Sequence, residues 1–149
     1  MRVLTLNAML HPLLKALGLL VLGMLFAGCE TQATTATVNG VEYSETEIAE
    51  GKALYKQFCA SCHGINGEGQ FPDRPLLPDV TGRFGAPPHN GNGHTSHHPD
   101  SWLIEYVRDG GVSLQNPEVY YPMPAFGDQL SDGQIAQVIA YIKTIWNDK

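Results

Sequence analysis

The run Cys59-Ala60-Ser61-Cys62-His63 lies near the middle of this 149-residue chain. A Cys-x-x-Cys-His run is the pattern for covalent attachment of a c-type haem. The spacing suits this chemistry because two thiols three positions apart can each add to one vinyl group of the porphyrin. The adjacent imidazole is then held beneath the iron. We therefore predict that Cys59 and Cys62 bind haem c covalently and that His63 binds its iron.

Two other chemistries use a pair of cysteines at this spacing. A structural zinc site needs four ligands, and the chain has no second Cys pair, so the remaining ligands would have to come from His63 or later histidines. A thioredoxin-like motif opens a helix, whose N-terminus lowers the thiol pKa. Here the cysteines follow a helical pattern instead. Haem attachment is therefore the favoured interpretation, with zinc binding and dithiol chemistry as the alternatives.

The N-terminal segment is typical of an export signal. Residues 16–28 form an apolar run without a charge, too short to span a bilayer and suited to the core of a signal peptide. Small residues immediately before Cys29 resemble a bacterial lipoprotein cleavage box, although Phe26 stands where an aliphatic residue is usual. We predict that residues 1–28 are removed and that Cys29 is lipidated. The alternative is a soluble periplasmic protein cut by ordinary signal peptidase.

The predicted mature chain is acidic. The whole chain has a net charge of −6, which becomes −8 when residues 1–28 are removed, because that segment holds Arg2 and Lys15 but no acidic residue. Such a charge argues against binding to nucleic acid and against direct attraction to anionic lipid headgroups. It favours a protein partner with a basic docking face.

Helix signals divide the rest of the chain. Residues 30–43 are rich in Thr and Ala and have few large apolar residues, so we expect residues 29–43 to be a lipid-attached cysteine and a flexible tether before a domain at 44–149. Ser44 and Glu47 form a capping box that starts a helix leading to the cysteines. Residues 64–99 have no sustained period and many Gly and Pro residues, which predicts irregular loop organised by a buried cofactor.

Two further helices are predicted in the C-terminal half. One starts at Pro99 and Asp100 and stops at Gly110. The other starts at a second capping box, Ser131 with Gln134, and carries an apolar stripe. The stripe needs cover, which the first helix can provide. Its residues are Ile135, Val138, Ile139, Ile142, Ile145 and Trp146.

The chain resembles class I bacterial cytochromes c over residues 44–147. Three features carry the resemblance: the motif at 59–63, the Tyr-Pro-Met-Pro-Ala-Phe run at 121–126, and a closing helix with Ser131, Asp132, Gln134 and Tyr141. The resemblance implies an all-α fold of three main helices and long loops wrapped around one covalently attached haem. It also implies a close crossing of the first and last helices through Gly51 and Tyr55 against Val138 and Tyr141.

The resemblance further implies the groups around the haem. His63 would be the proximal iron ligand and Met123 the distal one, with Pro122 and Pro124 restricting the backbone beside the methionine. The family also has a proline whose carbonyl accepts the proximal imidazole N–H and a leucine that packs on the haem. Pro75 and Leu76 are the predicted match, ahead of Pro78.

A histidine-rich loop lies outside the general family pattern. His94, His97 and His98, with His89 before them, can bind copper or zinc as a cluster. Alternatively, they cap the following helix, contact the haem propionates or face solvent. A histidine could also replace Met123 on the iron, which would give bis-histidine ligation and a lower potential.

These features together predict a monohaem electron carrier rather than an enzyme. It would be anchored through Cys29 on the outer side of a bacterial membrane and would pass single electrons between redox proteins, such as membrane respiratory or photosynthetic complexes. No small-molecule substrate and no nucleic acid are expected. The alternatives are a haem enzyme or a gas or peroxide sensor with a displaceable Met123, or metal capture by the histidine loop.

Overall fold

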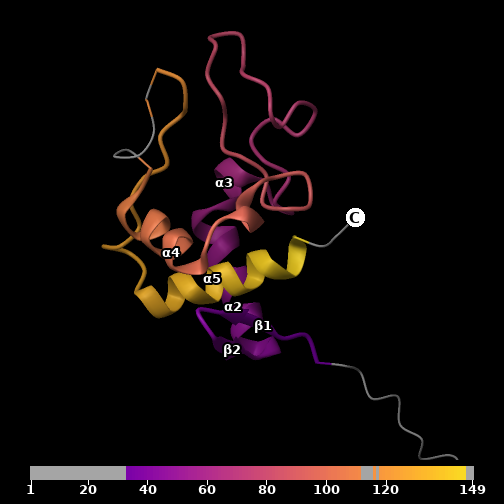
Figure 1. Cartoon of the computed structure of the whole chain (residues 1–149), viewed down its shortest axis with the longest axis vertical. Coiled ribbons are helices and arrows are strands. Elements are labelled where there is room, and N and C mark those ends of the chain that lie inside the picture. The colour runs from indigo at the N-terminus through magenta and orange to yellow at the C-terminus, as the bar shows by residue number, and fades with distance from the viewer. Residues whose placement is uncertain (1–32, 112–115, 117, 147–149) are drawn as a thin grey trace, which may run out of the picture. The chain divides into compact units, whose positions relative to one another are not determined.

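A computed structural model describes residues 33–111, 116 and 118–146 (Figure 1). The elements in chain order are β1 (Ala36–Val38), β2 (Val41–Tyr43), α2 (Glu45–Phe58), α3 (Ala60–His63), the 3-10 helix η1 (Thr95–His97), α4 (Asp100–Asp109) and α5 (Asp132–Ile145). The three main helices are α2, α4 and α5, which confirms the predicted helical fold. The predicted signal peptide and Cys29 lie outside the described residues. No helix in the described part is long and apolar enough to cross a membrane.

Helices α2 and α5 begin where the sequence predicted. Ser44 accepts a hydrogen bond from the backbone N–H of Glu47, and the Glu47 carboxylate accepts one from the Ser44 N–H at 2.8 Å. Ser131 and Gln134 make the same reciprocal pair at the start of α5. Each pair satisfies donors that the first helical turn leaves free. Both predicted capping boxes are confirmed.

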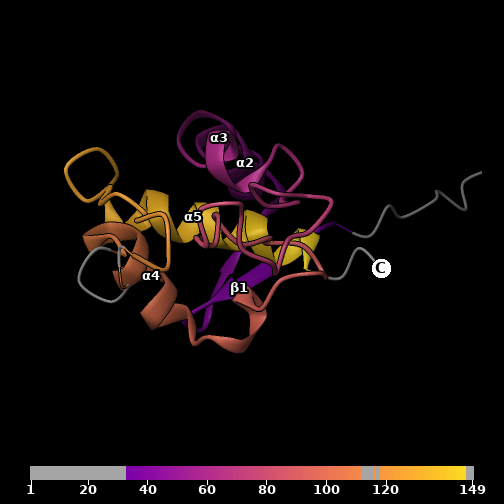
Figure 2. The ribbon, with the colours of Figure 1, turned by 90° about the horizontal axis from the view of Figure 1, so that it is seen from above.

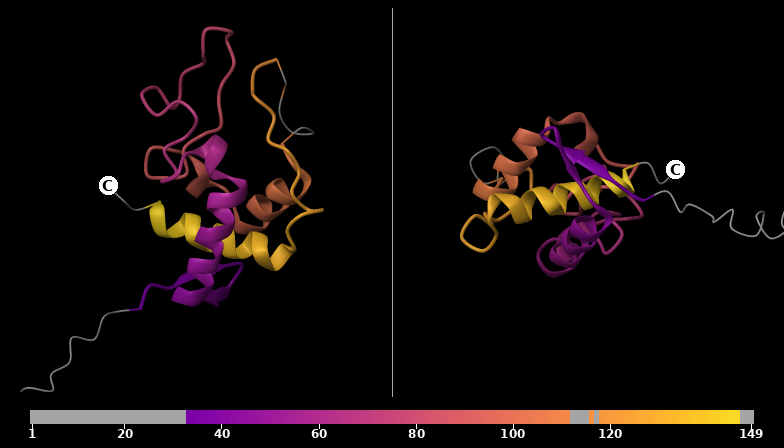
Figure 3. Two further views of the ribbon diagram at one scale, coloured as in Figure 1. Left: turned by 180° about the vertical axis from the view of Figure 1, so that it is seen from behind. Right: turned by 90° about the horizontal axis from the view of Figure 1, so that it is seen from below.

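Helix α2 crosses α5 at very close range, as Figure 3 shows. A Cβ atom on Gly51 would lie 2.0 Å from the Gln137 carbonyl oxygen, a distance that no side chain can occupy. One turn later, the ring of Tyr55 packs 5.3 Å from the ring of Tyr141, and the Tyr55 side chain is fully buried. The predicted crossing is thus confirmed, with glycine required by contact between the two backbones.

The core lies along α5, with α2 and α4 on opposite sides of that helix (Figure 2). Residues from every main helix contribute to it, and α5 supplies more of them than any other element. The fully or nearly fully buried side chains of α5 are Ile135, Ala136, Val138, Ile139, Ala140, Tyr141 and Ile142. The apolar stripe of this helix is therefore covered on both flanks.

The segment before α2 is a β-hairpin, so the prediction of a flexible tether was wrong for residues 36–43. Strands β1 and β2 pair antiparallel, with Val38 opposite Val41. The turn residues Asn39 and Gly40 both have positive φ, 50° and 78°, as a type I′ turn requires. Val38 is 1% exposed and belongs to the core. An Asn-Gly pair between alternating residues is a strong hairpin signal, and the prediction of a tether from composition did not take this pair into account.

An ion pair fastens the hairpin to the helices. Lys143 of α5 contacts Asp100 of α4 at 2.6 Å, and its ammonium also donates to the Thr37 carbonyl. The Asn39 N–H donates to the other oxygen of the same carboxylate at 2.9 Å. Both charged side chains are about four-fifths buried. The hairpin is therefore part of the domain.

The two long loops, before α4 and between α4 and α5, extend away from the hairpin in Figures 1 and 3. Residues 71–85 form an excursion closed at its base, where Gln70 donates its N–H to the Ala86 carbonyl and accepts the Ala86 N–H on its side chain. The predicted irregular structure of residues 64–99 is confirmed apart from η1.

Candidate haem site

The two cysteines of the motif lie where α2 ends and the short α3 begins. Cys59 is the C-terminal cap of α2 and is 8% exposed, whereas Cys62 is exposed. Neither is in a disulfide. After His63 the chain turns through Gly64 at φ +82°, a conformation that favours glycine. The Tyr55 hydroxyl donates to the Gly64 carbonyl at 2.8 Å, which fixes this turn against α2.

The surroundings of Cys59 disfavour dithiol chemistry. Burial, with a smaller contribution from Cys62, raises the pKa of the Cys59 thiol to about 12. A nucleophilic cysteine needs the opposite shift, because the thiolate is the reactive form. Zinc binding is also disfavoured, since the described residues hold no group of three or more His, Cys, Asp or Glu side chains arranged to hold a metal ion. Haem attachment is the chemistry that these two thiols fit.

The ring of His63 is held in one tautomer. Its Nδ1 lies 2.8 Å from the Pro87 carbonyl oxygen, which can only accept, so Nδ1 carries the proton. Its Nε2 therefore keeps a lone pair for a metal. His63 is 5% exposed, and burial lowers the pKa of the ring against the opposing effect of the Pro87 bond. A neutral, oriented imidazole is what iron ligation requires.

The partner of His63 corrects the prediction of Pro75. The carbonyl that accepts its N–H is that of Pro87, whereas packing of Leu76 on the haem stays a prediction. Both predicted residues lie in the 71–85 excursion, which the Gln70 and Ala86 pairing separates from the motif. After the excursion, the chain reaches the His63 ring at Pro87. Sequence spacing could not reveal this, because the register depended on where the loop closes.

His89 has a role that the sequence did not reveal. Its ring stacks on that of His63, with centroids 4.0 Å apart and planes inclined by 21°. Its Nδ1 lies 2.9 Å from Thr95 Oγ1, and that hydroxyl in turn donates to the Pro88 carbonyl. Burial, followed by the nearby imidazoles of His63 and His94, lowers the pKa of His89 well below its ordinary value. His89 is therefore a neutral ring that supports the ring of His63.

The other loop histidines do not converge. His94, just before η1, and His97, its last residue, are exposed, and the His98 ring stacks on Trp102 at 4.1 Å. The rings of His94 and His98 meet edge to face, with centroids 5.5 Å apart. Burial lowers the pKa of His98, with smaller effects from the two neighbouring histidines. The proposed metal cluster is not present as a site among the described residues, and propionate contact stays a prediction.

Met123 is partly buried and packs against the core. Its carbonyl accepts the Gly111 N–H at 2.9 Å, and the following residues Phe126 and Gly127 donate to the carbonyls at the end of α4. A Cβ on Gly110 would lie 2.7 Å from the Ala125 nitrogen, so a side chain there would displace the methionine segment. The C-terminal side of the segment is thus seated directly on the end of α4.

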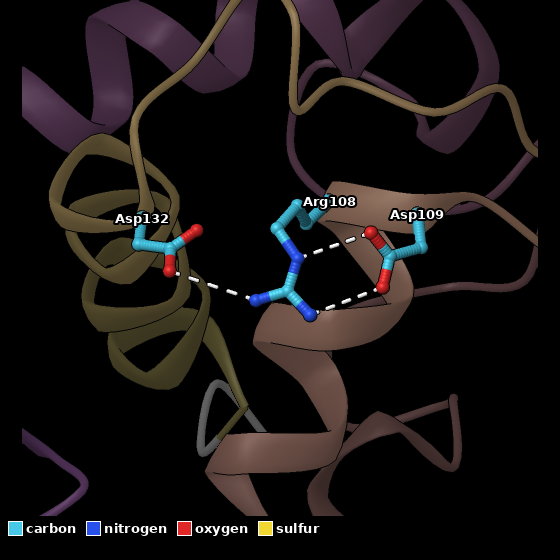
Figure 4. Close-up of polar contacts among 3 residues, drawn as sticks. All are labelled: Arg108, Asp109 and Asp132. Carbon is cyan, nitrogen blue, oxygen red and sulfur yellow. Dashed lines mark hydrogen bonds and ion pairs between the residues drawn. The ribbon is translucent and has the colours of Figure 1, made fainter.

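An ion-pair cluster joins the same end of α4 to the start of α5 (Figure 4). The Arg108 guanidinium makes two 3.0 Å bonds to Asp109 and lies 3.5 Å from Asp132. Asp109 holds the pKa of Arg108 above its usual range. These side chains are 39% to 66% exposed, so the cluster adds little stability. Arg108, Asp109 and Asp132 are not among the residues that fit a haem.

The donor set fits haem c. Two thiols free of disulfide bonding, one buried imidazole with a free Nε2 and the Met123 thioether, which packs against the core, are the groups such a haem uses. The sequence predicted these four residues, and their binding to the haem stays a prediction. The structure brings the motif and Pro87 together, although they are separated by the whole excursion.

Comparisons with known proteins agree with this site. The family model "Cytochrome c" matches residues 48–146. Cytochrome c6 of Picosynechococcus is 28% identical over 75% of this chain and 85% of its own length. The CcoP subunit of an Azospirillum cbb3-type cytochrome c oxidase is 27% identical, over 76% of this chain. The gluconate 2-dehydrogenase cytochrome c subunit of Pantoea cypripedii is 31% identical, over 66%.

The chain spans about 33% of the CcoP subunit and 20% of the gluconate dehydrogenase subunit. Both names describe subunits of redox enzymes. The family match covers the motif, the methionine segment, α4, α5 and all but the first three residues of α2. The chain therefore belongs to the cytochrome c family, as a class I c-type cytochrome that carries covalently attached haem c and transfers electrons.

Proposed function

We propose that this protein is a one-electron carrier whose haem is attached through Cys59 and Cys62 and whose iron is ligated by His63 and Met123. The observation that carries the proposal is the 2.8 Å bond from His63 Nδ1 to the Pro87 carbonyl. It leaves Nε2 as the free donor and makes the ring a better ligand. The bound haem would supply a reversible one-electron couple.

The protein's own contribution is to keep both iron ligands in place. His63 is held by Pro87 on one side and by the His89 ring on its face. Met123 is held by the Gly111 N–H and by core packing. Because a thioether favours the ferrous state, this ligand pair gives a high reduction potential. Because both ligands stay on the iron, the structural rearrangement that accompanies electron transfer is small.

The absorption spectrum of the oxidised holo-protein tests this ligation. We expect a sulfur-to-iron charge-transfer band that disappears in both Met123→Ala and Met123→His, because neither side chain supplies a thioether. A band unchanged in Met123→Ala would exclude Met123 as the ligand, and no band in the parent protein would exclude His/Met ligation. A matched fall in the reduction potential of Met123→Ala would support the assignment.

Carbon monoxide distinguishes a carrier from a haem enzyme or gas sensor. We expect the reduced parent protein to bind carbon monoxide slowly or incompletely at neutral pH, since Met123 occupies the sixth position. Met123→Ala should bind it promptly and stoichiometrically. Prompt binding by the parent would instead favour the enzyme or sensor alternative.

We also propose that the protein acts outside the cytoplasm, attached to a membrane through lipid on Cys29, with redox proteins as donor and acceptor. The sequence before Cys29 and the extracytoplasmic chemistry of haem c attachment support this location. Metabolic labelling with a fatty acid should mark the parent and leave Cys29→Ser unlabelled. Label in neither protein would favour ordinary signal cleavage and a soluble periplasmic form.

A further inference from the structure

The two long loops meet at a short parallel contact. Phe84 donates its N–H to the Val119 carbonyl at 2.8 Å, and Tyr121 donates its N–H to the Phe84 carbonyl at 3.1 Å. The rings of Phe84 and Tyr120 pack with centroids 5.5 Å apart. The contact therefore joins the 71–85 excursion to the segment that leads into Met123.

One carboxylate reinforces this contact with its side chain. Asp79 Oδ1 accepts the Thr81 N–H and hydroxyl and the Arg83 N–H, so it organises the turn at the tip of the excursion. Its second oxygen, Oδ2, accepts the Tyr121 hydroxyl at 2.8 Å. The Arg83 guanidinium lies over the Tyr121 ring, 5.4 Å from its centroid. The Tyr121 side chain is thus held at its hydroxyl and on its face.

Met123 needs such an anchor on its N-terminal side. Pro122 and Pro124 lack a backbone N–H, so neither can donate a hydrogen bond to hold the segment. The Gly111 N–H and the end of α4 hold the segment from Met123 onward. Before Met123, the nearest described residue that is anchored by its side chain is Tyr121. The methionine lies between these two attachments.

We propose that Tyr121 and Asp79 are positioning residues that hold Met123 against the haem iron and limit its displacement by external ligands. The proposal rests on the proposed ligation of the iron by Met123. Loss of the hydroxyl bond frees the N-terminal side of the segment, which favours states in which the weak thioether ligand has left. External ligands bind the iron in those states. The apparent affinity for an external ligand therefore rises as those states become more populated.

Imidazole binding to the oxidised holo-protein measures this directly. Loss of the charge-transfer band on titration reports displacement of the thioether. We expect Tyr121→Phe to bind imidazole about three- to tenfold more tightly than the parent, the effect of one net hydrogen bond. Asp79→Ala, which removes the acceptor of this bond, should give a change at least as large, and the double variant no more than the larger single change.

Tyr120→Phe is the matched control. Tyr120 is the adjacent tyrosine, is 39% exposed and contacts Phe84 through its ring, which phenylalanine retains. Its imidazole affinity should equal that of the parent. A Tyr120→Phe change as large as that of Tyr121→Phe would mean general loosening of the loops and would overturn the proposal. Fully additive effects of Tyr121→Phe and Asp79→Ala would also overturn it.

The outcomes separate the proposal from the ligation on which it rests. A parent protein without the charge-transfer band would overturn ligation by Met123 and, with it, the positioning role. A parent with the band and a Tyr121→Phe variant of unchanged imidazole affinity would overturn the positioning role alone. The denaturant midpoint of each variant shows that the compared proteins are folded.

Discussion

The crossing of α2 with α5 and the junction of the two long loops are stabilised in different ways. At the crossing, backbones touch through Gly51, and side chains such as Tyr55 and Ile135 are fully buried. At the loops, hydrogen bonds dominate, such as those of Phe84 with Val119 and Tyr121 and of Asp79 with Tyr121. The first region depends on tight packing, and the second depends on a few polar contacts.

This difference separates the two sides of the proposed haem site. The Cys59 to His63 motif begins at the end of α2, in the most tightly packed part of the domain. Met123 belongs to a loop whose N-terminal side is attached by Tyr121. Changes at the crossing should therefore alter global stability, whereas changes at the loop junction should alter ligand exchange.

Gly51→Ala should have the largest effect on stability. Its Cβ would clash with the Gln137 carbonyl oxygen at 2.0 Å, so the two helices must separate. We expect a loss of about 3 kcal/mol in the free energy of unfolding, despite the better helix propensity of alanine. Denaturant unfolding of the holo-protein measures it.

The control is Gly133→Ala in α5, where a Cβ would meet only Ser131 Oγ, at 3.9 Å. This variant should be unchanged or slightly more stable than the parent. Equal unfolding free energies for Gly51→Ala and the parent would show that the crossing tolerates separation. The stability of the domain would then not depend on tight packing at the crossing, as the comparison with the loop junction requires.

Tyr55→Phe tests the link from the packed region to the motif. The change removes the 2.8 Å bond to the Gly64 carbonyl while keeping the buried ring. We expect a loss of about 1–2 kcal/mol, because the carbonyl loses its buried partner. The same change at partly exposed Tyr43 is the control and should have little effect. Equal losses at both positions would argue against a specific role for the bond.

Lys143→Met tests whether the hairpin is fastened by its ion pair. The methionine keeps the apolar stem but removes the contacts with Asp100 and the Thr37 carbonyl. We expect a loss of about 1 kcal/mol, between the values for exposed and buried pairs. Faster amide exchange in β1 should accompany it. Lys56→Met, at an exposed position of α2, should leave both quantities unchanged.

Asp79→Asn should have the smallest effect on stability, and that effect depends on pH. The hydrogen bonds from Thr81 and Tyr121 hold the pKa of the Asp79 carboxyl well below its ordinary value of 3.8. Because the folded pKa is the lower one, ionised Asp79 stabilises the fold above pH 3.8. This contribution is lost as the pH falls below 3.8 toward the folded pKa.

Acid unfolding of the holo-protein measures that loss. The parent should lose stability more steeply with falling pH than Asp79→Asn, and the two acid midpoints should differ by about 0.2–0.5 pH unit. Asp73→Asn, an exposed position on the same loop, should follow the parent. A parent and an Asp79→Asn variant with parallel acid curves would contradict the role assigned to these hydrogen bonds.

Local signals predicted much of the fold. The capping boxes at Ser44 and Ser131 were correct because a cap is a contact between residues three positions apart. Gly51 was correctly assigned to a helix crossing. The hairpin at 36–43 was missed although its Asn-Gly turn is a local signal, because a composition rich in small residues was given more weight.

The partners of the motif were harder to predict. Pro75 was expected beside His63, but the structure places Pro87 there. The stacking of His89 on His63 had no signal in the sequence beyond the presence of a histidine. Both contacts depend on the length of the excursion and on the residues that close it. Several closures of such a loop differ little in entropy, so packing selects among them.

The sequence by itself determined the chemistry of attachment and the starts of the main helices. These follow from covalent spacing and from hydrogen bonds within a single helical turn. Only the tertiary structure decided which carbonyl holds His63, which ring supports it, and that Asp79 meets Tyr121 across 42 positions. Such contacts form between segments that the chain brings together only when the core has packed, so no local pattern encodes them.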